Sequence, residues 1–209
     1  MSPQLLLATR NPGKLLELRD LLSHLPLRLL TPDDLGPLPA VEETGATYAE
    51  NAGLKAAALA LASGHWTLAD DTGLEVAALL GAPGLHSARL VPSPAEGPLP
   101  SDADRRRRLL TLLAPHPRPW TARFRCVIAL ASPQGKVDLA EGLCPGEVVP
   151  AERGSGGFGY DPLFLLDGVT KTMAELSPQE KNRLSHRARA IAALLPVLLR
   201  RLDLPSPQR

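Results

Sequence analysis

The chain has 209 residues, of which 44% are hydrophobic and 22% charged, so a disordered or fibrous protein is excluded and one domain can bury a substantial core. Its net charge of +1 creates no global field that would draw it to nucleic acid or to a membrane. Cys126 and Cys144 lack metal-ligand spacing and are predicted to be buried packing residues in a reducing compartment. The apolar stretch from Ala188 to Leu199 is interrupted by Pro196 and is too short to span a bilayer, so we expect a soluble protein, and the cysteine usage favours the cytoplasm.

The first predicted elements are a short buried strand from Gln4 to Thr9 and a helix directly after it. Asn11 is a good N-cap, and Pro12 suits the first helical position. Gly13 allows close backbone approach, and Lys14 follows it in the first helical turn. Because a helix N-terminus presents amide donors and a positive dipole end, this junction is a candidate phosphate cradle. Simple helix capping explains the same residues equally well.

A second strand-to-helix junction is predicted further along the chain. A helix should begin at the capping sequence Thr47 to Glu50 and close at Gly64. The strand candidate Trp66 to Ala69 follows, and it leads through Asp70-Asp71 to a short predicted helix from Leu74 to Leu80. The acidic pair would therefore stand where a strand ends and a helix begins.

Two acidic pairs are candidate metal ligands. Asp70 and Asp71 are neighbours in an extended segment and point to different sides, so at most one of them faces a ligand. The pair Glu42-Glu43 lies upstream in a loop flanked by proline and glycine. Carboxylate oxygens suit a Mg²⁺ ion that bridges to substrate phosphates. Solvated loop charge is the competing interpretation of both pairs.

The middle of the chain predicts a loop, a helix and a hairpin. Pro92 to Pro100 should form a surface loop before a helix from Arg105 to Ala114. The basic run Arg105 to Arg108 is predicted to be a solvated helix face, because acidic residues precede it and no aromatic residue flanks it. Arg123 to Ala131 and Lys136 to Val149 predict an antiparallel hairpin, so the sheet should be mixed.

A glycine-rich segment, Gly154 to Gly159, formally matches the dinucleotide-binding pattern. Tyr160-Asp161-Pro162 follows it and opens no helix, so we reject a dinucleotide-binding fold. The remaining interpretations are a flexible turn that delivers Phe158 and Tyr160 for stacking on a base, and an ordinary turn with two core aromatic residues.

The C-terminal segment has another capping box, Ser177 to Glu180, and helical spacing of apolar residues continues to about Leu202. Lys181, His186 and Arg187 add three donors to this otherwise apolar segment. Solvent exposure is the default interpretation of these residues, and a bound ligand is the alternative.

In joint order and spacing, these motifs resemble those of the inosine/xanthosine triphosphate pyrophosphatases, which hydrolyse non-standard purine nucleoside triphosphates to the monophosphate and pyrophosphate. The resemblance covers Leu5 to about Leu195. The segments that carry it are Ala8 to Lys14, Glu42 to Gly45, Glu50 to Ala52, Ala69 to Leu74, Gly81 to Gly84, Gly157 to Pro162 and Ser185 to Arg187.

The resemblance implies roles for individual residues. Those implied to hold the triphosphate are Thr9, Arg10, Asn11, Pro12, Gly13 and Lys14. Glu42 and Asp71 are implied to ligate Mg²⁺, with Asp71 also the catalytic base, and Lys14 would stabilise the departing pyrophosphate. Whether Glu43, Glu50 or Asp70 also binds the metal stays open. The residues implied to contact the rest of the substrate are Thr72, Phe158, Gly159, Tyr160, Asp161, Lys181, His186 and Arg187.

The implied fold is an elongated α/β structure with a mixed sheet, flanking helices and a central substrate cleft. Residues 1–209 would form one domain with two lobes around that cleft, usually as a homodimer. One continuous C-terminal helix, at about 100° per residue, would place Lys181 and Arg187 about 240° apart. If both bind the nucleotide, the helix must break, with Asn182 in a left-handed exit conformation and Ser185 capping the new start.

Two other functions remain in view. A Maf-like pyrophosphatase would act on modified pyrimidine nucleotides, and the segments Phe158 to Asp161 and Ser185 to Arg187 argue against it. A nucleotide-binding regulator without turnover would need phosphate donors but no acidic metal site. Release of pyrophosphate from inosine triphosphate (ITP) separates the regulator from an enzyme.

Overall fold

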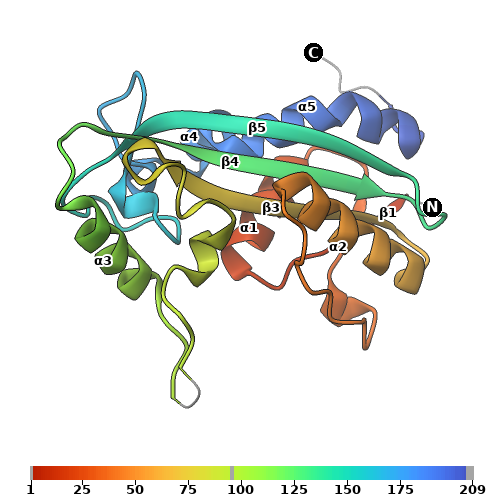
Figure 1. Cartoon of the computed structure of the whole chain (residues 1–209). Helices are drawn as coiled ribbons and strands as arrows, with labels where there is room; N and C mark the ends of the chain where they lie inside the picture. The colour runs from red at the N-terminus through yellow and green to blue at the C-terminus, as the bar shows by residue number, and fades with distance from the viewer. Residues whose placement is uncertain (1, 95–96, 206–209) are drawn as a thin grey trace. The chain divides into compact units, whose positions relative to one another are not determined.

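The computed structural model describes residues 2–94 and 97–205, so Ala95 and Glu96 of the predicted Pro92 to Pro100 loop lie outside the described residues. Helices and strands alternate along the first half of the chain (Figure 1). In chain order they are β1 (Gln4–Leu7), α1 (Pro12–Leu22), β2 (Arg28–Leu30), α2 (Tyr48–Ser63), β3 (Trp66–Val76), α3 (Asp102–Leu113), β4 (Trp120–Ala131), β5 (Val137–Val148), β6 (Phe164–Leu166), α4 (Pro178–Leu184) and α5 (His186–Arg201).

Over the described residues the strands form a six-stranded sheet in the order β2-β1-β3-β4-β5-β6. β1 pairs in parallel with β2 and β3, whereas β5 and β6 are antiparallel. Parallel neighbours need crossover connections, which α1 and α2 provide, while a tight turn starting at Ser132 joins β4 to β5. The fold class is therefore mixed α/β, which confirms the mixed sheet predicted from the sequence.

The chain divides into two compact units. Unit 1 comprises Met1–Asp71, Cys126–Gly142 and Arg187–Arg209, and unit 2 comprises Thr72–Arg125 and Leu143–His186. The long strands β3, β4 and β5 each contribute residues to both units.

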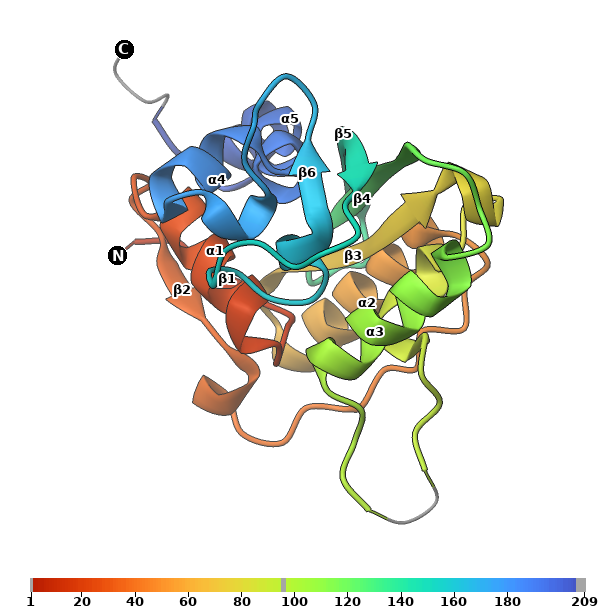
Figure 2. The same ribbon diagram turned by 90° about the vertical axis from the view of Figure 1, so that its left-hand side faces the viewer.

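In unit 1, helices cover both faces of the strands. α1 and α5 lie on one face and α2 on the other (Figure 2). Strands buried on both faces read as continuous apolar runs, which explains the sequence Leu5 to Leu7.

The helix boundaries agree with the predicted caps: the Asn11 side chain accepts a hydrogen bond from the Lys14 amide, and Gly64 ends α2 in the left-handed conformation.

Unit 2 has its own core, built around aromatic side chains. The rings of Phe124 and Phe164 lie 4.6 Å apart, centroid to centroid, and Leu109 and Leu113 of α3 are fully buried in the same cluster. α3 begins at Asp102, three residues before the predicted start at Arg105, because Ser101 provides the cap.

The short helix predicted from Leu74 to Leu80 is wrong. β3 continues to Val76, and only a 3-10 turn, Ala77–Leu79, follows it. Leu74 and Val76 are fully buried in the unit 2 core, and this tertiary packing favours the extended conformation. Asp70 and Asp71 therefore lie inside a strand and not at a strand-to-helix junction.

The break expected in the C-terminal helix is confirmed. α4 ends at Leu184, Ser185 is extended with ψ 158°, and α5 begins at His186. The left-handed exit expected at Asn182 is wrong, because Asn182 is helical and the extended backbone of Ser185 makes the turn.

Within residues 2–94 and 97–205, no helix is long and apolar enough to cross a membrane.

Candidate functional site

The loop between β1 and α1 is organised by its own short polar side chains. The Asn11 amide donates to Thr9 Oγ1 (3.2 Å), and Asn11 Oδ1 accepts from the Lys14 amide (3.1 Å). Arg10, Asn11 and Pro12 are exposed. The loop therefore presents the positive end of the α1 dipole to solvent, an arrangement that favours an anion such as phosphate.

Asp70 is held by cations from both ends of the chain. Its Oδ2 atom lies 3.0 Å from Lys14 Nζ on α1 and 2.9 Å from Arg187 Nη2 on α5. Burial opposes the ionised form, but the charges of Lys14, Arg187 and Lys55 hold the pKa of Asp70 well below its usual range. Asp70 is therefore ionised and neutralised by its neighbours.

Arg187 is completely buried, with only 1% of its surface exposed. It donates to Asp70 and, through Nη1, to Glu17 on α1. Burial disfavours its charge, yet these two carboxylates raise the pKa of Arg187. Its guanidinium thus ties α5 to α1 and β3 within unit 1, which sequence analysis did not anticipate.

Asp71 has a different environment, because alternation along β3 turns it to the other face of the strand. Its Oδ2 atom accepts a hydrogen bond from Asn51 Nδ2 on α2 (3.1 Å). Burial raises the pKa of Asp71; the Asn51 hydrogen bond opposes this rise, and the nearby charge of Glu43 adds to it.

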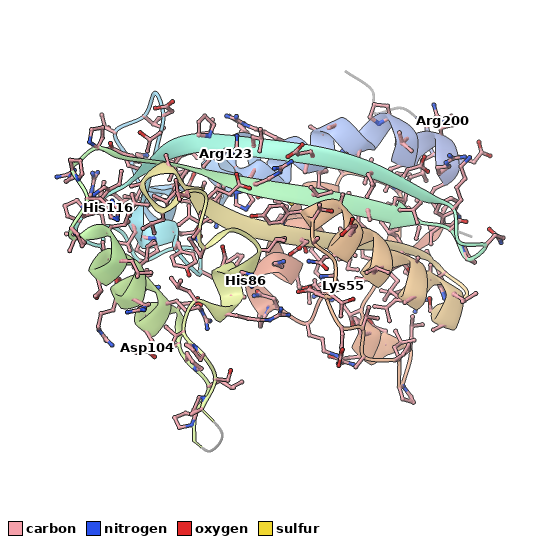
Figure 3. The ribbon with its side chains drawn as sticks, in the orientation of Figure 1. Lys55, His86, Asp104, His116, Arg123 and Arg200 are labelled. Atoms are coloured by element: carbon pink, nitrogen blue, oxygen red, sulfur yellow. The ribbon has the colours of Figure 1, made fainter. Side chains whose placement is uncertain are left out.

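Of the two loop acids, Glu43 is the one that binds Lys55. Lys55, labelled in Figure 3 on α2, donates to Glu43 Oε1 and to the Asp70 carbonyl, both at 2.8 Å. Glu42 is exposed. Lys55 and Asn51 are one helical turn apart on α2, so the same helix face contacts Glu43, Asp70 and Asp71.

The donor set around Asp71 fits a hard divalent cation. Asp71 and Glu43 supply carboxylate oxygens. Burial is the main reason for the raised pKa of Asp71 and the charge of Glu43 adds to it, and a bound cation would offset both effects. Among the described residues, no group of three or more His, Cys, Asp or Glu side chains stands ready to hold a metal ion. A Mg²⁺ ion would therefore need oxygens from its substrate or from water.

In unit 2 the glycine-rich turn presents one aromatic ring and buries the other. The Phe158 ring is half-buried, and Lys181 Nζ lies 5.1 Å from its centroid. Asp161 accepts hydrogen bonds from the Phe158 amide and from Lys181 Nζ. Tyr160 is only 4% exposed and donates to the Ser87 carbonyl, so its side chain anchors the turn in the core.

His186 also belongs to unit 2, together with the half-buried Thr72. The His186 ring stacks on Phe124 with centroids 4.6 Å apart. The fold thus groups the predicted site residues in two sets. Unit 1 contains Thr9, Arg10, Asn11, Pro12, Gly13, Lys14, Glu42, Asp71 and Arg187, and unit 2 contains Thr72, Phe158, Gly159, Tyr160, Asp161, Lys181 and His186.

Sequence reasoning assigned no contact to Glu17, Asn51 or Lys55, although each bonds a predicted site residue or its neighbour. The signals in the sequence were spacings, since Glu17 follows Lys14 by three positions and Asn51 and Lys55 are four apart, together with the place of Asn51 in the Glu50 to Ala52 segment. The solvated face predicted for Arg105 to Arg108 is wrong at Arg106, whose side chain is 14% exposed and contacts Glu152 and the Gly159 carbonyl.

The sequence and the fold are similar to those of known proteins. The family model described as the Ham1 family matches residues 5–197. A dITP/XTP pyrophosphatase of Desulforamulus reducens is 44% identical, covering 94% of this chain and 96% of its own length. One from Gloeobacter violaceus is 48% identical, covering 91% and 92%. A solved HAM1 protein of Coxiella burnetii is 39% identical with a TM-score of 0.83, covering 95% of this chain and 99% of its own. The chain therefore belongs to the Ham1 family.

Proposed function

We propose that this protein hydrolyses non-standard purine nucleoside triphosphates, namely ITP, dITP and xanthosine triphosphate (XTP), to the monophosphate and pyrophosphate. The observation that carries this proposal is the pair Asp70-Asp71, in which one acid is neutralised by cations and the other has a raised pKa. Opposite environments at adjacent acids are typical of sites that need one acid for structure and one for proton transfer. Relatives of similar length bear the name dITP/XTP pyrophosphatase, which supports the same reaction here.

The triphosphate would bind the loop from Thr9 to Lys14. The α1 dipole and the amides of its first turn offer positive potential there, and the Lys14 ammonium adds a formal charge. The ion pair with Asp70 fixes the position of that ammonium. Lys14 would therefore stabilise the departing pyrophosphate without a large loss of side-chain freedom.

Glu42 and Asp71 would hold the Mg²⁺ ion, and Glu43 is a further candidate because its charge reaches Asp71. When bound, Mg²⁺ neutralises phosphate charge and polarises the attacking water. Asp71 would orient that water and take its proton as the oxygen attacks the α-phosphorus. The bond to the bridging oxygen then breaks, and its electron pair leaves with pyrophosphate.

The nucleoside would be recognised by residues of the second set. The Phe158 ring would stack on the base, next to the Lys181–Asp161 pair. Inosine and xanthosine carry a 6-keto acceptor where adenine carries a 6-amino donor, so a donor from His186 or Arg187 would favour the keto group. The buried Arg187 already binds two carboxylates, which favours His186 as that donor.

Steady-state release of pyrophosphate tests this function directly. We expect turnover of ITP and XTP with Mg²⁺, loss of turnover in chelator, and discrimination against ATP by a factor of about 10⁴, the scale at which polar sites reject a mismatched group. ATP hydrolysed as efficiently as ITP would contradict the proposed base recognition. Binding of ITP without pyrophosphate release would instead indicate a regulator without turnover.

We also propose that the active form is a homodimer. The family resemblance supports this assignment, and light scattering coupled to size-exclusion chromatography tests it. A mass of twice 22.2 kDa is expected, and a mass of one chain at all working concentrations would contradict it.

A further inference from the structure

The glycine-rich turn of unit 2 is held by a helix far away in the sequence. The Gly159 amide donates to Asp102 Oδ2 (2.7 Å), and the Gly159 carbonyl accepts from Arg106 Nη1 (2.9 Å). Both polar groups of this residue are thus bound by side chains of α3. Asp102 and Arg106 are four positions apart, so they lie on the same face of the helix.

Gly159 needs such external support because of its backbone conformation. Its φ is +61°, in the left-handed region, and a Cβ atom there would meet nothing within 4 Å. Glycine is therefore required for its conformational freedom and not for lack of space. That same freedom leaves the turn without an intrinsic preference for the observed shape.

The two clamping side chains also form ion pairs. Asp102 Oδ1 pairs with Arg105 Nη2 (2.8 Å), and Arg106 Nε pairs with Glu152 Oε1 (2.9 Å). Partial burial raises the pKa of Asp102, but the Gly159 amide and Arg105 outweigh burial and lower it, so Asp102 is ionised at neutral pH. Hydrogen bonds to ionised groups are stronger than those between neutral groups, which suits a clamp on a flexible residue.

Gly159, the residue that α3 clamps, directly follows Phe158 in the sequence. On the other side, the Phe158 amide donates to Asp161 Oδ2 (2.9 Å), and Lys181 Nζ lies 5.1 Å from the Phe158 ring centroid. The ring is therefore positioned from two directions, by Asp161 inside the turn and by α3 through Gly159. Loss of either set of bonds would let the ring shift.

We propose that Asp102 and Arg106 are positioning residues that hold the Gly157 to Asp161 turn, and with it the Phe158 ring, ready to stack on the purine base. This inference rests on the proposed function, because the base is the ligand in question. Neither side chain needs to touch the substrate: both act through the Gly159 peptide.

The test compares Asp102→Ala and Arg106→Gln with Arg107→Gln. Arg107 is the matched control, because it neighbours Arg106 on α3, is 75% exposed in its side chain and pairs through that side chain with Asp104 (labelled in Figure 3). For the two clamp variants we expect KM for ITP to rise about tenfold, the scale of a lost base–aromatic stack. Their kcat should stay within about twofold, and product inhibition by pyrophosphate should be unchanged, because the phosphate loop is untouched.

Conservative variants and hydrogen exchange separate positioning from general stability. Asp102→Asn keeps a neutral acceptor and Arg106→Lys keeps one donor, so both should recover part of the KM change. Amide exchange at Phe158 to Tyr160 should be faster in Asp102→Ala and Arg106→Gln than in Arg107→Gln. A lowered Tm with unchanged KM and unchanged exchange in this turn would overturn the proposal.

Failure of the clamp and failure of the proposed function are distinguishable. If the unaltered protein does not hydrolyse ITP, the function fails, and the clamp is then tested by calorimetric titration with inosine monophosphate. Weaker binding in the clamp variants than in Arg107→Gln would support the clamp. If the unaltered protein is active but the clamp variants match it in KM, the clamp alone is overturned.

Discussion

Asp70 and Asp71 are adjacent in the sequence, yet their carboxyls have opposite electrostatic environments. Asp70 contacts Lys14 and Arg187, which lower its pKa, whereas Asp71 contacts Asn51 and lies near Glu43. The cause is the alternation of side chains along β3. A carboxylate with a raised pKa accepts a proton more readily than one held ionised by cations, which favours Asp71 over Asp70 as the general base.

Replacing Asp71 should separate turnover from stability. We expect Asp71→Asn to reduce kcat at least about a hundredfold, the scale for a lost general base. Because the pKa of Asp71 is raised, ionisation of this carboxyl is less favourable in the folded protein than in the unfolded chain, so removing the charge should preserve or increase the free energy of unfolding. Pyrophosphate release and urea unfolding at neutral pH measure the two effects.

Asp70→Asn is the matched comparison. It should reduce kcat less than Asp71→Asn does, and it should lower the stability. It leaves the buried Arg187 with Glu17 as its remaining carboxylate, and breaking one partner of a buried pair costs about 3–5 kcal/mol. The free energy of unfolding should therefore fall sharply. Equal losses of kcat in both variants, with equal stability, would contradict the assignment of Asp71.

At the scale of elements, the capping box of α4 gives a pH-dependent prediction. Glu180 accepts from Lys171 and from the Ser177 amide, and these bonds lower its pKa to about 2. Because the folded pKa is depressed, this stabilisation is present above the unfolded value of about 4.3 and is lost as pH falls towards 2. Glu180→Gln should thus lower Tm at neutral pH, and the difference from the unaltered protein should shrink between pH 4.5 and 2.

The control for this element is Lys171→Gln, which removes the other half of the same pair. In this variant, replacing Glu180 by Gln should change Tm less and with a weaker dependence on pH, because the Lys171 hydrogen bond is the largest cause of the lowered pKa of Glu180. A Tm difference between Glu180→Gln and the unaltered protein that is constant from pH 7 to about 2 would show that the charge of Glu180 has no role in stability.

Elements defined by local chemistry could be predicted from the sequence, and those defined by tertiary packing could not. The caps at Asn11, Thr47 and Gly64 bounded α1 and α2 correctly, because a cap depends on a few neighbouring residues. The extent of β3 was missed, because burial of Leu74 and Val76 in the unit 2 core decided it. Likewise, the spacing around Lys14 predicted a phosphate cradle, but its bond to Asp70 depends on the sheet.

At the scale of the whole molecule, the strands shared by the two units bear on whether the units unfold cooperatively. The two compact units have separate cores, yet β3, β4 and β5 each run through both. If one unit unfolded alone, three strands would lose their ladder partners part of the way along their length. We therefore expect both units to unfold together, as a single domain would.

The chain contains two tryptophans, one in each unit, which makes this expectation measurable. Trp66 lies at the start of β3 in unit 1, and Trp120 lies at the start of β4 in unit 2, where it is 6% exposed. In Trp120→Phe the fluorescence reports on unit 1, and in Trp66→Phe it reports on unit 2. Urea transitions followed by tryptophan fluorescence and by far-UV circular dichroism should coincide within each variant, because coincidence of probes is the mark of two-state unfolding. A fluorescence transition that precedes the loss of secondary structure in one variant would show that its unit unfolds independently, and that the shared strands do not couple the two cores.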